Sequence, residues 1–165
     1  SGVVDVARKH GYTFEIMETV LRVNDTVKAR MVEKVAEVCG DLAGKKVAVL
    51  GLAFKPETDD IRDSSAIKLI RDLVARGASV TAYDPAAMEN TKAILPEVGY
   101  ADDVYGCAEG ADALVLITDW NQFRKLDLER LEKTMKAKRF VDLRNLYEPK
   151  EMKRLGWEYT SIGRS

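Results

Sequence analysis

The sequence predicts an α/β fold: a Rossmann-like, doubly wound parallel sheet of about five strands, preceded by a long helix. Two observations predict this class. From residue 46 onward, short apolar runs alternate with segments of helical periodicity, an order typical of βαβ units. The chain has 165 residues, a length that fits one hydrophobic core of ordinary size.

The leading helix is predicted from the segment between Phe14 and Val38, which contains no proline or glycine. Its apolar residues recur at helical spacing over about 25 residues, roughly 37 Å at 1.5 Å per residue. A helix of this length is long for one that only flanks a compact domain, so we expect it to connect domains or to dimerise. Asn24 falls on the apolar stripe, where a buried amide needs partners; tipping to solvent or bonding locally is the alternative.

Strands and helices then alternate after Gly44. Apolar runs ended by turn residues predict five strands: Val47–Gly51, Ser79–Tyr83, Ala113–Thr118, Arg139–Leu143 and Trp157–Thr160. Helical spacing and capping residues predict the segments between them: a helix capped by Asp63 or Ser64 and ending at Gly77, then Ala86–Leu95, Asp102–Glu109, Asp127–Ala137 and Pro149–Leu155. Right-handed crossovers favour an order such as 3-2-1-4-5, with the first strand central.

Composition excludes several classes of function. Lys and Arg total 26 against 27 Asp and Glu, so a net charge of -1 gives no general attraction to nucleic acid or to an anionic membrane. Two distant cysteines, Cys39 and Cys107, and a single histidine, His10, support neither a zinc site nor a disulfide framework. This cysteine usage favours a reduced, cytoplasmic setting. We expect a soluble protein, because no apolar run approaches the roughly 20 residues that span a bilayer and the N-terminus lacks the apolar core of a signal peptide.

The loop after the first strand has the composition of an anion site. Lys55 and Arg62 lie between Gly51 and the N-terminus of a predicted helix, where unpaired N–H groups favour phosphate or pyrophosphate. Because the residues after Gly51 do not form a G-x-G-x-x-G turn, there is no NAD fingerprint, and side chains would have to hold the anion. The alternative is that both cations are solvated surface residues beside the acids of the loop.

Other strand ends reach the same edge of the predicted sheet. Arg144, after the fourth strand, should point toward the same crevice as Lys55 and complete a clamp for a diphosphate. Asp84 occupies the position of a ribose ligand in dinucleotide folds, although Asp-Pro after a strand is also a plain turn. Trp120 with Phe123 is interpreted as a packing pair rather than a base-stacking platform. Cys107 is interpreted as a small buried residue rather than a nucleophile, because no histidine lies near it in sequence.

Several motifs, in the same order along the chain, carry a family resemblance. They are GLAFKPETDDIRDSS at 51–65, YDP at 83–85, ALVLITDWNQFRKLD at 113–127 and VDLRNLYEPKEMKRLGWEYTSIGR at 141–164. Together they resemble the C-terminal UDP-binding domain of the UDP-glucose 6-dehydrogenases, within the UDP-glucose/GDP-mannose dehydrogenase family. The leading helix, with VLRVND at 20–25, is similar to the end of that family's central helical segment.

The resemblance implies an enzyme that oxidises UDP-glucose to UDP-glucuronate with two NAD+ through a covalent thiohemiacetal and thioester. It implies that Phe54, Lys55 and Arg144 bind the UDP-sugar, and that Arg62 reaches toward NAD held by an N-terminal domain. It also implies a homodimer formed through the long helix. Residues 1–44 would then be the end of the helical dimerisation segment, and residues 45–165 the nucleotide-sugar-binding domain.

Neither Cys39 nor Cys107 lies in the glycine-rich catalytic segment of that family, so no catalytic residue is expected in this chain. The chain alone is therefore expected to be catalytically inert, with NAD bound mainly by the missing domain. Three alternatives stay open: a relative acting on UDP-N-acetylmannosamine or GDP-mannose, a non-catalytic assembly module, and a response-regulator-like or coenzyme-binding α/β domain. The last fits the strand order but lacks a cluster of acids directly after the first strand.

Overall fold

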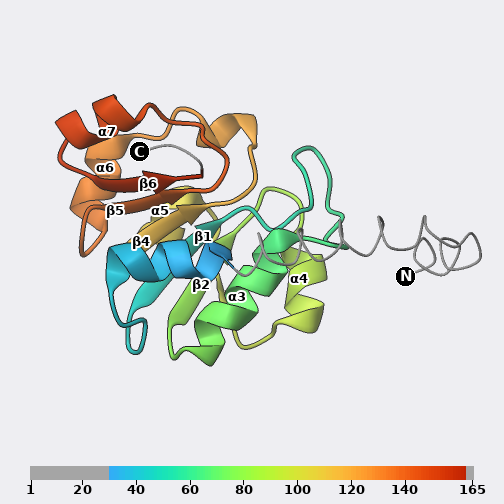
Figure 1. The fold of residues 1–165 in the computed structure, drawn as a ribbon. Coiled ribbons are helices and arrows are strands. Elements are labelled where there is room, and N and C mark those ends of the chain that lie inside the picture. Colours follow the sequence, from blue (N-terminus) through green and yellow to red (C-terminus); the bar gives the residue numbers. More distant parts are fainter. Residues whose placement is uncertain (1–29, 163–165) are drawn as a thin grey trace, which may run out of the picture.

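The computed structural model describes residues 30–162, which contain one sheet of six parallel strands (Figure 1). The strands are β1 (Lys46–Leu50), β2 (Ser79–Tyr83), β3 (Gly99–Tyr100), β4 (Ala113–Leu116), β5 (Arg139–Asp142) and β6 (Glu158–Ser161). Their order in the sheet is β3-β2-β1-β4-β5-β6, and every neighbouring pair is parallel. The predicted fold class is confirmed.

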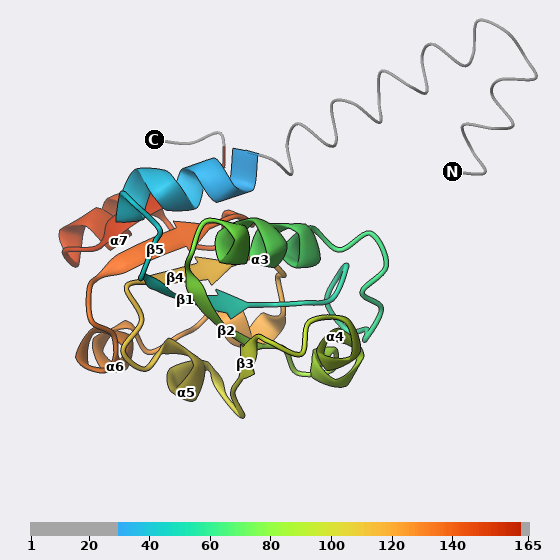
Figure 2. The ribbon, with the colours of Figure 1, turned by 90° about the horizontal axis from the view of Figure 1, so that it is seen from below.

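Helices cover both faces of this sheet (Figure 2). A helix over residues 30–39 and α3 (Ser65–Ala75) lie on one face, while α5 (Val104–Ala108) and α6 (Leu128–Thr134) lie on the other. The remaining elements are α4 (Met88–Ile94), the 3-10 helix η1 (Asn121–Phe123) and α7 (Pro149–Arg154). Within residues 30–162, no helix combines the length and hydrophobicity needed to cross a bilayer.

The core follows from the alternation of side chains along β1. Val47 and Val49 join the cluster formed with the helix over residues 30–39 and α3, whereas Ala48 and Leu50 join the cluster with α5 and α6. All four are fully buried. A strand with both faces covered reads as a continuous apolar run, which is why the sequence signal of β1 was strong.

The predicted strand order is wrong in one respect. It placed the strand that begins at Ala113 beyond β2, but this strand, β4, pairs directly with β1. The outer edge of β2 is taken by β3, whose two residues, Gly99 and Tyr100, are too few to show any periodicity. The first strand is nevertheless central, as predicted. The loop after β1 lies at the switch point of the sheet, where β2 is on one side of β1 and β4 on the other.

The leading helix is described only in its last part. In the helix over residues 30–39, Val32, Val35 and Cys39 are buried against the same core as β1. The remainder of the predicted helix, including Asn24, lies outside the described residues, and the proposed dimerisation through it stays a prediction. The division between residues 44 and 45 likewise stays a prediction.

Candidate functional site

The site begins at Gly51, where the chain leaves β1. Gly51 has φ +104°, a region that residues with a Cβ rarely adopt. A Cβ on this residue would lie 2.5 Å from both Cβ and Oγ1 of Thr118. The N–H of Gly51 donates to the carbonyl of Tyr83 at 2.8 Å, so the loop starts between the end of β2 and Thr118, two residues beyond β4. Only glycine permits this close passage.

The Asp84 carboxylate fixes the next residues of that loop. It is fully buried at the end of β2, and its two oxygens accept five hydrogen bonds of 2.8–3.3 Å. The donors are the N–H groups of Leu52, Ala53, Ala86 and Ala87 and the indole N–H of Trp120. The interpretation as a turn residue is supported, because both carboxylate oxygens already accept hydrogen bonds from protein donors.

Two hydroxyl groups hold the other side of the loop. Ser64 caps α3 with its Oγ, which accepts from the N–H of Ala66 and donates to the carbonyl of Leu52 at 2.7 Å. Thr118 Oγ1 donates to the carbonyl of Ala53 at 3.0 Å. The backbone up to residue 53 is therefore anchored on both sides, and it delivers the next two side chains, Phe54 and Lys55, to one place.

These side chains border a cavity of about 310 Å³ at the carboxyl end of the central strands. Phe54 and Lys55 come from the loop after β1, and Arg144 from the loop after β5. The remaining lining residues are Met31, Ala53, Ser64, Ser65, Ala66, Ile117, Thr118 and Leu143. The predicted convergence of Lys55 and Arg144 is found in the structure, and Phe54 lines the same cavity. The first turn of α3 adds the positive end of its helix dipole to the two cations.

Within residues 30–162, Phe54 is the most exposed large apolar side chain. Its relative exposure is 57%, although the residues before it, Leu52 and Ala53, are buried. Exposed aromatic side chains on anchored backbone are common in ligand sites, because they offer apolar area at little conformational cost. The cavity thus combines one aromatic surface with two cationic groups.

The Arg144 loop is organised by a second buried carboxylate, Asp142. One oxygen accepts the N–H of Arg144 at 3.1 Å, and the other accepts the N–H groups of Leu146 and Tyr147 and the hydroxyl of Tyr159. This arrangement explains the first and third residues of the D-x-R-N segment. The aspartate turns the chain so that the arginine side chain leaves the sheet edge.

The asparagine of the same segment closes the loop. Asn145 adopts φ 55°, in the left-handed region that asparagine tolerates. Its amide exchanges two hydrogen bonds of 3.0 Å with the backbone N–H and carbonyl of Ile162, just after β6. Arg144 is therefore presented by a backbone that is fixed on both sides.

Asp119 is a residue of this site that the sequence reasoning did not assign. Its Oδ1 lies 3.4 Å from Nη2 of Arg144, and its Oδ2 lies 3.6 Å from Nη2 of Arg124. Oδ1 is buried, and no residue between 30 and 162 meets it with hydrogen-bond geometry. The only available signal was its position directly after the third predicted strand, which does not separate it from a surface acid.

Arg62 is not brought to the same cavity. It forms a bidentate ion pair with Asp60, with Nε–Oδ1 3.0 Å and Nη2–Oδ2 2.9 Å, and its side chain is 88% exposed. The hydrogen bonds from Arg62 lower the pKa of the Asp60 carboxyl to about 2. This pair borders a separate hollow of about 490 Å³ with Asn90. The prediction from spacing that Lys55 and Arg62 hold one anion jointly is therefore wrong, because a neighbouring acid two residues away pairs with Arg62.

Two other predictions are confirmed. Cys107 is fully buried, and burial raises the pKa of its thiol to about 12, while the S–H contacts the carbonyl of Thr81 at 3.3 Å. A thiol in this state is not a nucleophile. Trp120 is buried in the same cluster as Phe123, which supports the packing interpretation.

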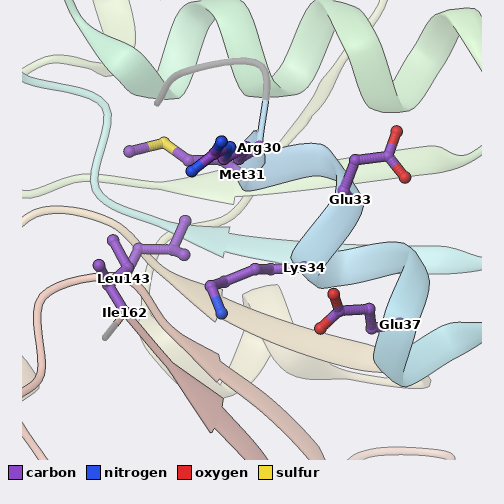
Figure 3. A pocket seen from close by; sticks show the side chains of 7 residues that line it. All are labelled: Arg30, Met31, Glu33, Lys34, Glu37, Leu143 and Ile162. Atoms are coloured by element: carbon purple, nitrogen blue, oxygen red, sulfur yellow. The ribbon is translucent and has the colours of Figure 1, made fainter. Parts of the chain in front are cut away.

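A larger hollow, of about 590 Å³, lies beside the candidate site (Figure 3). It runs between the helix over residues 30–39 and the segments after β5 and β6, and it shares Met31 and Leu143 with the smaller cavity. Figure 3 shows two cations and two acids, Arg30, Lys34, Glu33 and Glu37, on the helical side. These charges balance, so this hollow has no preference for an anion.

Residues 30–162 contain no group of three or more His, Cys, Asp or Glu that could hold a metal ion. The cavity after β1 and β5 is lined by the cations Lys55 and Arg144 and by the aromatic ring of Phe54. Cationic and aromatic side chains around a cavity suit an anion that is attached to a planar or apolar group.

Comparison with known proteins gives a consistent result. Residues 48–149 match the model of the UDP binding domain of the UDP-glucose/GDP-mannose dehydrogenase family. Over 163 residues, the chain is 48% identical to a UDP-glucose 6-dehydrogenase of Rhizobium meliloti, covering 98% of this chain and 37% of that protein.

Solved structures agree with this match. A UDP-glucose dehydrogenase from Pyrobaculum islandicum is 32% identical with a TM-score of 0.77, over 96% of this chain and 34% of that one. An NDP-N-acetyl-D-galactosaminuronic acid dehydrogenase from Methanosarcina mazei is 31% identical with a TM-score of 0.76, over 87% of this chain and 30% of that one. The chain thus spans about a third of the length of the relatives that it matches.

Proposed function

Because the chain belongs to the UDP-glucose/GDP-mannose dehydrogenase family and carries its UDP binding domain, we propose that it is the UDP-sugar-binding part of an NAD-dependent UDP-glucose 6-dehydrogenase. The complete enzyme would oxidise UDP-glucose to UDP-glucuronate. The observation that carries this proposal is the cavity that unites Phe54, Lys55 and Arg144 with the first turn of α3.

Each of these groups has a role in the proposal. The Lys55 ammonium and the Arg144 guanidinium neutralise the pyrophosphate, and Arg144 offers the planar, forked donor that suits phosphate oxygens. The exposed ring of Phe54 covers an apolar face of the nucleotide sugar. The N-terminus of α3 supplies further N–H groups with a favourable dipole.

NAD does not fit the described part of this chain. The loop after β1 has one glycine, Gly51, followed by buried Leu52, and the Asp84 carboxylate is already bound to five protein donors. A dinucleotide fingerprint needs a glycine-rich turn and a free acidic group for the ribose. We therefore propose that NAD is held by a part of the protein outside this chain, where the exposed Arg62 reaches toward it.

Three further features belong to the same proposal. Turnover requires the NAD-binding domain and the catalytic cysteine segment, so the chain alone is inert. The protein is a homodimer through the helix that includes residues 30–39. It works in the cytoplasm, consistent with two buried cysteines, Cys39 and Cys107, that are free thiols.

Other members of the family act on other nucleotide sugars, and the Methanosarcina mazei structure is an example. UDP-glucose is favoured here because the curated relative from Rhizobium meliloti, at 48% identity, is a UDP-glucose 6-dehydrogenase. GDP-mannose and UDP-N-acetylmannosamine are the alternatives. A module that serves only assembly would bind none of them.

Calorimetric titration of the chain with UDP, UDP-glucose and GDP-mannose at low salt tests the proposal. We expect saturable binding of the uridine nucleotides, with Lys55→Ala and Arg144→Ala each costing about 1–3 kcal/mol because each removes a charge-assisted contact. Lys68→Ala is the matched control, since Lys68 is an exposed α3 lysine paired with Asp72. Selective binding of GDP-mannose would move the chain to another branch, and no binding to any nucleotide would contradict the proposal.

A further inference from the structure

Asp119 places a negative charge beside the proposed diphosphate site. Its Oδ1 is 3.4 Å from Arg144 Nη2, and Arg144 lines the cavity. An acid at this position opposes an incoming diphosphate and also competes with it for the guanidinium. A binding site for anions needs some means of cancelling that charge.

Arg124 is placed to cancel it. Its Nη2 lies 3.6 Å from the other carboxylate oxygen of Asp119, although Arg124 is not among the residues that line the cavity. The 3-10 helix η1 lies between the two residues and turns the chain back. Arg124, directly after η1, therefore meets Asp119, which precedes Trp120. Arg124 and Arg144 thus share one carboxylate, each through a different oxygen.

The contact between Asp119 and Arg144 is loose. At 3.4 Å it lacks hydrogen-bond geometry, and no donor within residues 30–162 satisfies the buried Oδ1. Both arginine side chains are 48% exposed. Arg144 is therefore held near the carboxylate without being saturated by it, and its N–H groups remain available to a stronger acceptor. A doubly charged diphosphate is such an acceptor.

We infer that Arg124 is a positioning residue for nucleotide-sugar binding: it neutralises Asp119 and thereby releases Arg144 to the diphosphate. The inference rests on the proposed function of the cavity. Together the two arginines and Asp119 carry one net positive charge, and Lys55 adds a second. This equals the charge of the diphosphate bridge of a nucleotide sugar, which carries two negative charges.

Charge-paired variants measured by calorimetry with UDP test this inference. Removing the cation by Arg124→Ala should weaken UDP binding about three- to fivefold, the upper part of the range expected for a partly exposed ion pair. Asp119→Asn should bind UDP at least as tightly as the wild type, because the opposing charge is gone. The double variant Arg124→Ala/Asp119→Asn should return to within about twofold of the wild type, a rescue that loss of local structure would not give.

Arg154→Ala is the matched control, because Arg154 is an exposed arginine paired with Glu151 on α7 and away from the cavity. An unchanged affinity in Arg124→Ala would overturn the inference, and so would a double variant that binds as weakly as Arg124→Ala. Weaker binding by Asp119→Asn alone would show instead that the acid is needed as an anchor. If Lys55→Ala and Arg144→Ala weaken UDP binding while Arg124→Ala does not, the proposed function stands and only this inference fails. A wild-type chain without UDP binding contradicts both.

Discussion

Asp84→Asn is the substitution that best separates a structural acid from a ligand at this edge of the sheet. The carboxylate is fully buried and accepts five hydrogen bonds, three through Oδ2 and two through Oδ1. An asparagine keeps one acceptor oxygen and turns the other position into an NH2 group. If the amide oxygen faces the three donors on the Leu52 side, the N–H groups of Ala86 and Ala87 lose their acceptor and face another donor.

An unsatisfied buried donor costs about 1–3 kcal/mol. The N–H of Ala87 is buried and that of Ala86 only partly buried, so the two together predict a loss of roughly 2–4 kcal/mol. Such a loss is a large share of the 5–15 kcal/mol that typically separates folded from unfolded protein. Urea unfolding followed by circular dichroism measures it, with Asp102→Asn as the control at an exposed aspartate. UDP binding should also weaken, because Asp84 anchors the loop that presents Lys55.

A free energy of unfolding for Asp84→Asn within about 0.5 kcal/mol of the wild-type value, as for a surface substitution, would contradict a structural role of Asp84. Unchanged stability together with weaker nucleotide binding would restore the interpretation of Asp84 as a ligand. The two outcomes are distinct, because unfolding and titration are measured on the same purified variant.

Three further predictions follow from single features of the site and core. Gly51→Ala should lower the free energy of unfolding, measured in urea, by more than about 3 kcal/mol, because the added Cβ has no space. Gly44→Ala is the control: Gly44 has φ +77° and nothing within 4 Å of an added Cβ, so its loss should be only about 1 kcal/mol of backbone strain. Arg62→Ala should return the pKa of Asp60 from about 2 toward its ordinary value near 3.8 in an NMR titration. Since the folded pKa is lowered, the ion pair stabilises the fold above that ordinary value, and this stabilisation is lost as pH falls toward 2. An Asp60 pKa that stays near 2 in Arg62→Ala would contradict the assignment. Cys107 should resist a thiol reagent at pH 8 in the native chain and react after unfolding in urea, because burial raises its pKa to about 12; rapid native labelling would show that the site opens.

The α/β class was predictable because the central strands are strongly apolar and alternate with segments of helical periodicity. β1 and β4 are buried on both faces, and their continuous apolar runs are visible in any reading of the sequence. β3 was not predictable, since two residues carry no pattern and the strand exists only through main-chain pairing with Thr81 and Ala82. Missing β3 also misplaced β4, because the edge beside β2 was left free for another strand.

The meeting of Lys55 with Arg144 was predictable from topology alone, because parallel strands bring their carboxyl ends to one edge. The separation of Arg62 was not, because it depends on a local turn in which Asp60 accepts from both the backbone and the side chain of Arg62. Asp119 was missed for a related reason. Its two arginine partners lie 5 and 25 positions away in the chain, and only the fold brings both to one carboxylate.

At this edge of the sheet, aspartates fix the loops and cations line the cavity, a difference in role that composition cannot reveal. Asp84 and Asp142, at the ends of β2 and β5, are the acids that a sequence offers most readily as ligands, yet both are fully buried and occupied by protein donors. Each one shapes the loop that carries a cation, Asp84 for Lys55 and Asp142 for Arg144. A buried carboxylate that accepts several hydrogen bonds fixes the backbone around it, whereas an exposed cation stays available to a ligand. The binding surface therefore consists of the cationic side chains on the loops that the two aspartates hold in place. An acidic substitution at Lys55 or Arg144 should therefore abolish binding of a nucleotide diphosphate without unfolding the chain, whereas loss of either buried acid should damage both.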